Sequence, residues 1–309
     1  MRRTPRTPTL NTVFEVGSVV SGYIIDAHLG GGASANVYRV HREGQSARLA
    51  MKVLRAGAAS HAKARDRFAR EFDIASLLHH PHIVAVYARG EIAAEPPAYP
   101  TLWMTTQYVD GPDSAVLIPG PSAQPDVAVL LLVAKQMAAA LDYAHSVEVL
   151  HRDVKPANIL LSADHRFAYL TDFGIAQLID DVKPLASNGR VEGSIAYAAP
   201  ELLQAQQLTR ATDLYALACT MFEWLTGSPP FPRSTTFAVT YAHLHDPVPP
   251  LTWRRPWLPG SLDAVFAKAL AKNAAARYDS CAEFVDIVAR TLRDVPVPAG
   301  PPHRRMSRP

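Results

Sequence analysis

The stretch LHRDVKPANIL, residues 150–160, begins and ends with apolar residues and carries several polar side chains between them. The side chains that could carry chemistry there are His151, Arg152, Asp153, Lys155 and Asn158. A second segment, TDFGIA at residues 171–176, follows the apolar run AYL and adds Asp172. Carboxylate and amide oxygens are ligands that Mg²⁺ prefers, and a solvated charged loop would not need both segments at this spacing. The pair therefore predicts two adjacent loops that hold a divalent cation.

Upstream of these loops, three features suit the binding of phosphate. The stretch LGGGASANVYRV, residues 29–40, could bring backbone amides close to phosphate oxygens, although such a hairpin is more often only a tight turn. Lys52 stands in an apolar strand, where its ammonium must reach an anion or extend into solvent. Glu71 lies on the inward face of an amphipathic stretch, residues 62–78, and could pair with that lysine. Together with the two loops, these features indicate Mg²⁺-assisted phosphoryl transfer.

Length and composition describe a globular chain. The 309 residues are 48% hydrophobic, which excludes a compositionally disordered protein. The net charge of +3 lies partly in the termini, so no concentrated basic face for nucleic acid is predicted. Cys219 and Cys281 fall in apolar helical stretches and are predicted to be buried thiols rather than a disulfide or a metal site. We find no long apolar run and no leader-like N-terminus, so a cytoplasmic protein without a membrane segment is expected.

The residue pattern divides the chain into four parts. Residues 1–17 and 295–309 are rich in proline and arginine and are predicted to be flexible tails. Residues 18–109 contain short apolar runs and one amphipathic stretch, which predicts a small sheet with one helix. Residues 110–294 contain longer helical patterns, which predicts a larger and mainly helical domain. Turn formers at residues 110–112 mark the join as a hinge.

Several histidines are spaced closely enough to suggest a metal site. His79, His80 and His82 stand together in LLHHPHIV, without a cysteine or carboxylate close by. A turn with partly exposed imidazoles is the favoured interpretation. The same interpretation is applied to His243 and His245.

Taken in order along residues 20–292, these motifs resemble the eukaryotic-like (Hanks-type) serine/threonine protein kinases of bacteria. The resemblance includes Ala199-Pro200-Glu201, Asp213, and Arg277, which in the family pairs with that glutamate. It implies an α+β, bilobal protein-kinase fold, with a small β-rich N-lobe carrying one main helix and a larger, mostly helical C-lobe. Lys155, two residues after Asp153, is typical of the serine/threonine branch.

The resemblance also assigns catalytic roles. Lys52, held by Glu71, would bind the α- and β-phosphates of ATP. Asp153 would orient the substrate hydroxyl or accept its proton, while Lys155 steadies the γ-phosphoryl group. Arg152, beside the catalytic aspartate, would pair with an anion from the activation segment.

The ligands of ATP and its metal follow from the same resemblance. Asn158 and Asp172 would bind Mg²⁺, or Mn²⁺ in its place. Thr106 would gate the back of the adenine pocket, and Ala50 and Leu160 would enclose the base. The residues assigned to the nucleotide are Gly30, Gly31, Gly32, Val37, Ala50, Lys52, Thr106, Gln107, Val109 and Leu160.

Two departures from the family pattern stand out. Ala35 replaces the third glycine of the Gly-rich loop, which predicts a stiffer loop because alanine disfavours positive φ. The activation segment, ASNGRVEGSIAYAAPE at residues 186–201, lacks the threonines that its relatives phosphorylate. Ser187 is then the credible regulatory site, and Ser194 stands where a family threonine contacts the catalytic loop.

A permanent anion could replace such a phosphate. The candidates for pairing with Arg152 are Asp180, Asp181 and Glu192, and both explanations stay open.

These observations favour an active serine/threonine kinase that phosphorylates Ser/Thr hydroxyls of proteins, and its own chain, in bacterial signalling. The alternatives are a pseudokinase that serves as a nucleotide-binding scaffold, and a small-molecule phosphotransferase. The intact set of Lys52, Asp153, Asn158 and Asp172 argues against the scaffold. Homodimers formed through the N-lobe are common among relatives.

Overall fold

The computed structural model describes residues 14–31, 35–54, 62–93, 100–173 and 193–298. The chain forms two compact units. The first comprises Met1–His79 and Val84–Val109, and the second comprises His80–Ile83 and Asp110–Pro309.

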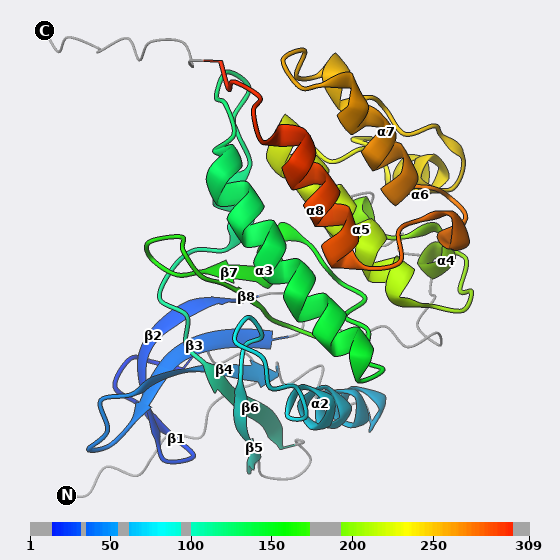
Figure 1. The fold of residues 1–309 in the computed structure, drawn as a ribbon. Coiled ribbons are helices and arrows are strands. Elements are labelled where there is room, and N and C mark those ends of the chain that lie inside the picture. The colour runs from blue at the N-terminus through cyan, green and yellow to red at the C-terminus, as the bar shows by residue number, and fades with distance from the viewer. Residues whose placement is uncertain (1–13, 32–34, 55–61, 94–99, 174–192, 299–309) are drawn as a thin grey trace, which may run out of the picture. The chain divides into compact units, whose positions relative to one another are not determined.

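The first unit is an antiparallel sheet with strand order β1-β2-β3-β4-β6-β5 (Figure 1). The strands are β1 Val19–Val20, β2 Tyr23–Gly31, β3 Ala35–Arg42, β4 Arg48–Leu54, β5 Val86–Ile92 and β6 Thr101–Gln107. Alternate residues of β3 and β4, among them Tyr38, Val40 and Met51, are fully buried in one cluster. The alternation arises because successive side chains of a strand point to opposite faces.

Helix α2, Ala62–Ala75, is the helix predicted from the amphipathic stretch. Its Phe68 is buried with Leu102 and Met104 of β6. Two arginines tie the helix to β5. Arg65 pairs with Glu91 of β5, and Arg89 of β5 donates to the Ala69 carbonyl at 2.8 Å.

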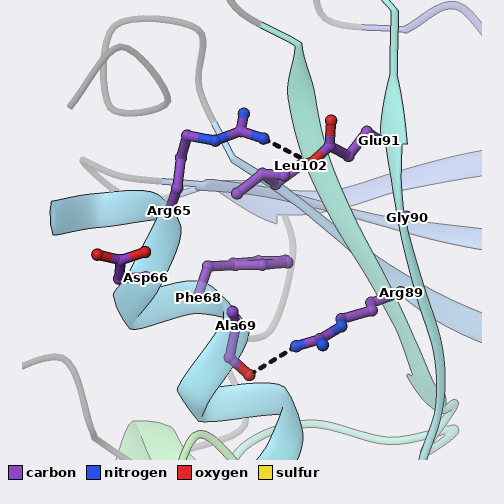
Figure 2. Close-up of a pocket in the computed structure, with 8 residues that line it drawn as sticks. All are labelled: Arg65, Asp66, Phe68, Ala69, Arg89, Gly90, Glu91 and Leu102. Atoms are coloured by element: carbon purple, nitrogen blue, oxygen red, sulfur yellow. Dashed lines mark hydrogen bonds and ion pairs between the residues drawn. The ribbon is translucent and has the colours of Figure 1, made fainter. Parts of the chain in front are cut away.

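The two arginines border a cavity of about 380 Å³ between α2 and the sheet (Figure 2). Phe68 and Leu102, which line it, are only 3% and 6% exposed. An occupant would therefore bury little additional apolar surface there. Gly90 lines the same cavity, and a Cβ at this position would lie 2.5 Å from the Trp103 ring.

The second unit is mainly helical, with a two-stranded sheet of β7 and β8. Its elements are η1 Ser114–Leu117, α3 Val127–Ser146, η2 Pro156–Asn158, β7 Ile159–Leu161, β8 Ala168–Leu170, η4 Gly193–Tyr197, α4 Pro200–Leu203, α5 Arg210–Thr226, α6 Thr236–His245, η5 Leu251–Trp253, α7 Gly260–Ala269, η6 Ala274–Ala276 and α8 Cys281–Leu292. Helix α3 packs against α5 and α8 (Figure 1). The elements confirm the predicted α+β class, with a β-rich part that carries one main helix and a larger, mainly helical part.

Helix α5 is the centre of the second unit. Every residue from Ala211 to Thr226 is buried, as expected of a helix that is surrounded by others. It begins at a capping box formed by Thr209 and Thr212, and ends at Gly227, whose φ of 90° is left-handed. A side chain on Gly227 would also place a Cβ 2.7 Å from the Pro119 carbonyl oxygen.

Helix α3 is long and apolar enough to cross a membrane, by length and composition alone. Lys135 and Asp142 interrupt its apolar sequence, so it is not an uninterrupted apolar run. The helix packs against α5, α8 and β8 and buries Leu130, Met137 and Leu141, which is the behaviour of a core helix. Cys219 and Cys281 are free and buried, which confirms their prediction as buried thiols.

Candidate active site

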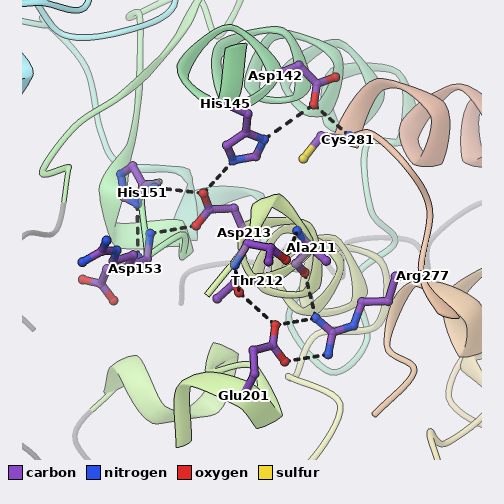
Figure 3. Close-up of polar contacts among 12 residues, drawn as sticks. Asp142, His145, His151, Asp153, Glu201, Ala211, Thr212, Asp213, Arg277 and Cys281 are labelled. Atoms are coloured by element: carbon purple, nitrogen blue, oxygen red, sulfur yellow. Dashed lines mark hydrogen bonds and ion pairs between the residues drawn. The ribbon is translucent and has the colours of Figure 1, made fainter. Parts of the chain in front are cut away.

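The loop that carries Asp153 is anchored by Asp213, a fully buried residue in the first turn of α5. The Asp213 carboxylate accepts hydrogen bonds from the backbone amides of His151 at 2.9 Å and Arg152 at 2.7 Å (Figure 3). His145 of α3 donates to the same carboxylate through Nε2 at 2.7 Å. Arg152 has a left-handed φ of 67°, which these bonds maintain despite its side chain.

The side chains of the loop converge on the Asp153 carboxylate. Lys155 Nζ lies 2.6 Å from Asp153 Oδ2, and Asn158 Nδ2 donates to the same oxygen at 2.9 Å. Asn158 Nδ2 also donates to the Asp153 carbonyl at 2.8 Å. Oδ1 of Asp153 takes no part in these bonds, and the side chain is 33% exposed. The carboxylate is thus held through one oxygen and can receive a proton through the other.

The two predicted loops are adjacent. Residues of β7 pair with residues of β8, Ile159 opposite Leu170, and Thr171 N donates to the Asn158 carbonyl at 3.0 Å. Asn158 and Asp172 therefore stand at the same end of this small sheet. Asp172 is exposed and has a left-handed φ of 55°, an uncommon conformation for aspartate and one that is found at functional sites.

His151 and His145 received no role from the sequence, yet both hold the loop. His151 is fully buried, and its ring packs on Phe173 with centroids 4.7 Å apart. Its Nδ1 accepts from the Asp153 amide, and its Nε2 donates to the Thr171 carbonyl at 2.9 Å. Through these two hydrogen bonds, His151 links the loop of Asp153 to the loop of Asp172.

A second buried anchor joins α4 to α5. Arg277 forms a bidentate pair with Glu201, with N···O distances of 2.7 and 2.9 Å, and also donates to the Ala211 carbonyl (Figure 3). Thr212 donates to Glu201 at 2.9 Å. The side chains of Arg277 and Glu201 are 0% and 5% exposed, so this pair is sheltered from water and salt.

The two anchors predict a loss of stability in acid. Burial alone would raise the pKa of Glu201 and of Asp213, but Arg277 and His145 respectively outweigh it, so both pKa values lie below their ordinary 4.5 and 3.8. A depressed pKa contributes stability that is present above the unfolded-state value and is lost as the pH falls. We expect the free energy of unfolding, measured by urea denaturation, to decline as the pH falls below about 4.5. Glu201→Gln should flatten this decline; an unchanged slope would contradict the assignment.

The other group with metal-ligand residue types among the described residues is Asp142, His145 and Cys281. Asp142 already accepts from the amides of Cys281 and Ala282 at the start of α8, each at 2.9 Å. His145 is engaged by Asp213. Because these groups already form hydrogen bonds to the first amides of α8 and to Asp213, the cluster links α3, α5 and α8.

The predicted nucleotide residues of the first unit lie on neighbouring strands. Lys52 of β4 stands opposite Val37 of β3 and Met104 of β6, and Ala50 stands opposite Thr106. Gly30 and Gly31 end β2, whereas Gly32 lies outside the described residues. Glu71 lies on α2, but its side chain is not among those that the structure describes, so its pairing with Lys52 stays a prediction.

In the predicted nucleotide set, the Gln107 amide donates to the Ala85 carbonyl at 2.8 Å, and the Gln107 carbonyl lies 3.5 Å from the Thr106 hydroxyl. The reason given for a stiffer Gly-rich loop needs correction. Ala35 belongs to β3 and does not have a positive φ. Alanine is therefore an ordinary strand residue there, and a disfavoured positive φ was the wrong reason to predict a stiffer loop. Leu160 lies in β7 and Val109 at the end of the first unit.

The predicted regulatory residues lie mostly outside the part of the chain that the structure describes. Ser187 lies in the segment 174–192, which is not described, and the side chain of Ser194 is not described either. Arg152 has a buried Nε atom with no hydrogen-bond partner in the part of the chain that is described.

The predictions about the histidines are confirmed in part. The His82 amide donates to Nδ1 of His80 at 3.1 Å within a turn, and the His80 ring stacks on Tyr143. His79 is exposed, and the interpretation as a turn is confirmed. His245 is exposed as expected, but His243 is fully buried, so the expectation of a partly exposed imidazole was wrong there. The apolar residues that cover it come from distant elements, which no local pattern could indicate.

Comparison with known proteins agrees with this site. Residues 23–278 match the family model described as the protein kinase domain. The serine/threonine-protein kinases PknF and PknJ of Mycobacterium tuberculosis are 42% and 40% identical to 89% of this chain, covering 57% and 46% of their own lengths. The chain thus spans about half the length of these curated relatives.

The crystal structure of the M. tuberculosis PknI kinase domain superposes with a TM-score of 0.69 at 35% identity, covering 90% of this chain and 100% of that one. The family match, the sequence identity and the similarity of fold therefore all agree with the Asp153 loop that Asp213 holds in place. The chain belongs to the protein kinase family, in its bacterial serine/threonine branch.

Proposed function

We propose that this chain is a kinase domain that transfers the γ-phosphoryl group of ATP to Ser/Thr hydroxyls of proteins. The observation that carries the proposal is the Asp153 carboxylate, held through Oδ2 by Lys155 and Asn158 on a loop fixed by Asp213. A fixed carboxylate whose Oδ1 takes no part in these hydrogen bonds of the described residues suits the orientation of a hydroxyl group.

The residues present fit a divalent cation. Asn158 uses its Nδ2 for Asp153, which leaves the amide oxygen for a ligand, and Asp172 offers an exposed carboxylate at the same end of the small sheet. Oxygen donors of this kind suit Mg²⁺ or Mn²⁺. A bound cation would neutralise charge on the ATP phosphates. Lys52, supported by Glu71, is proposed to contact the α- and β-phosphates, with the glycines of β2 beside them.

In the transfer step, the acceptor oxygen forms a bond to the γ-phosphorus while the bond to the β,γ-bridging oxygen breaks and ADP departs. The proton of the hydroxyl passes to Asp153. Lys155 is proposed to steady the γ-phosphoryl group during its transfer. Positioning and charge stabilisation supply most of the rate, because little covalent chemistry is left for the protein.

Metal dependence tests the proposal. We expect phosphate transfer from ATP to casein with Mg²⁺, loss of transfer in EDTA, and recovery when excess Mg²⁺ or Mn²⁺ is added. Asp172→Asn should lower transfer by about 100-fold or more, because a neutral amide binds the cation poorly. Asp164→Asn, an exposed aspartate in the turn between β7 and β8, is the matched control and should keep wild-type activity. Nucleotide binding without any transfer would instead indicate a scaffold, and transfer only to small molecules would indicate a different phosphotransferase.

We further propose that Arg152 pairs with an anion of the activation segment, because its buried Nε has no hydrogen-bond partner among the described residues and a buried donor left unpaired is unfavourable. Phosphate on Ser187 or the carboxylates of Asp180, Asp181 and Glu192 would serve. Phosphosite mapping in the same assay separates them: activity-linked phosphate on Ser187 supports a switch, and an active Ser187→Ala variant supports permanent carboxylates. Proteins are the proposed substrates, the ATP-containing cytoplasm is the proposed compartment, and a homodimer is the proposed assembly.

A further inference from the structure

His243 is a fully buried histidine on α6 whose position has no explanation in the sequence. Its Nδ1 atom lies 2.8 Å from the hydroxyl of Tyr215, a fully buried residue of α5. The imidazole packs edge-on against Phe231, with ring centroids 5.0 Å apart. A polar ring in such surroundings is costly unless its nitrogens are satisfied.

The hydrogen bonding determines which nitrogen carries the proton. Burial, followed by the charge of Lys272, lowers the pKa of His243 to about 4, so the ring is neutral at physiological pH. Burial also raises the pKa of Tyr215 well above its ordinary value, so its hydroxyl keeps its proton and donates to Nδ1. A neutral ring that accepts at Nδ1 carries its hydrogen on Nε2.

His243 also contacts the Ala196 backbone of η4, and because Tyr215 occupies Nδ1, Nε2 is the nitrogen left for that contact. Nε2 is buried and makes no hydrogen bond of good geometry among the described residues. Helix α6 contacts η4, and Ala196 stands in the middle of that element. A buried donor beside a backbone carbonyl favours the position of η4 in which the hydrogen bond is complete.

Helix α5 supports both η4 and the catalytic loop. Near its start, Asp213 holds the amides of the Asp153 loop. Two residues further along, Tyr215 holds His243, and near the end of the helix Glu223 accepts from Tyr197 of η4. Tyr215 also lies under the Arg277 guanidinium, at 4.7 Å, and Arg277 fixes Glu201 just after η4. Any movement of η4 on α5 therefore changes its position relative to Asp153.

We infer that His243 is a positioning residue that sets η4, through the Tyr215 hydroxyl and the Ala196 backbone, as part of the surface that receives the acceptor polypeptide. The inference rests on the proposed function, because it concerns how the protein substrate is brought to Asp153. His243 contacts neither the nucleotide residues nor the catalytic loop in the described structure, so its effect should appear in the acceptor and not in ATP.

The test compares four variants with the wild type, with casein as the acceptor. His243→Phe keeps the ring volume but loses both polar nitrogens, Tyr215→Phe removes the donor to Nδ1, and His243→Gln retains one acceptor and one donor. We expect the first two to raise the KM for casein about tenfold, as the loss of one buried hydrogen bond implies, with the KM for ATP unchanged. His243→Gln should recover most of the loss. His245→Phe, an exposed histidine on the same helix, is the matched control and should behave as wild type.

Hydrogen exchange supplies a readout that does not need activity. We expect faster exchange of the amides of residues 193–199 in His243→Phe and Tyr215→Phe, with exchange in α3 unchanged. Unaltered exchange in this segment, or equal increases in both KM values, would overturn the inference. If the wild type transfers no phosphate, the proposed kinase activity fails, while the exchange of residues 193–199 still decides whether His243 positions η4.

Discussion

Asp153→Asn is expected to lower phosphate transfer by about 100-fold or more while nucleotide binding persists. Asparagine keeps the shape of the side chain and an oxygen for Lys155 and Asn158, but it cannot take up the proton of the acceptor hydroxyl. Removal of a positioned general base costs about 100- to 10,000-fold in rate. Transfer to casein should fall within or beyond this range, and the dissociation constant for ATP, measured by calorimetry, should change less than about threefold.

The control for this variant is Asp279→Asn. The Asp279 side chain is 95% exposed and its distance to Arg210 is 3.7 Å, so the change removes one solvated charge from the same unit. It should retain wild-type transfer. Activity above a tenth of the wild-type rate in Asp153→Asn would show that another residue orients the hydroxyl. Lost ATP binding in that variant would show that the substitution had disturbed the fold.

Arg277→Met is expected to destabilise the second unit by about 3–5 kcal/mol, the usual cost of leaving one partner of a buried ion pair uncompensated. Glu201 is only 4% exposed, and without Arg277 the one side chain among the described residues that still donates a hydrogen bond to its carboxylate is Thr212. The free energy of unfolding can be followed by urea denaturation with circular dichroism at 222 nm, since this unit is mainly helical.

Arg210→Met provides the matched comparison. Arg210 pairs with Asp279 at 3.7 Å, but the two side chains are 62% and 95% exposed. Loss of such a pair should change the free energy of unfolding by less than about 1 kcal/mol. The double change Glu201→Gln with Arg277→Met should recover part of the loss, because no buried charge is then left unpaired. Equal effects of Arg277→Met and Arg210→Met would mean that the buried pair contributes no more than a surface contact.

The sequence predicted that the polar residues of the Asp153 loop lie together, because these residues are local. Asp153, Lys155 and Asn158 stand within six positions of one another, and the hydrogen bonds between them need only the turn of η2. The short strands of the first unit and the long helices of the second were also predicted, since hydrophobic periodicity is a local property of the chain. The ion pair of Glu201 with Arg277 could be expected only by resemblance, because its members are 76 residues apart.

The sequence by itself determined which residues can carry chemistry: the carboxylates, the lysines and the amide, at spacings that serve phosphoryl transfer. Only the tertiary structure decided how they are held. His145 and Asp213 are in contact although they are 68 residues apart in the sequence, and so are His243 and Tyr215, which are 28 residues apart. These contacts form because α5 is buried on all sides, so that polar groups of several other elements pack against it. A histidine in such a place has the same local sequence as an exposed one. Whether it becomes a solvated side chain or a buried support depends on packing between distant segments, which no local pattern encodes.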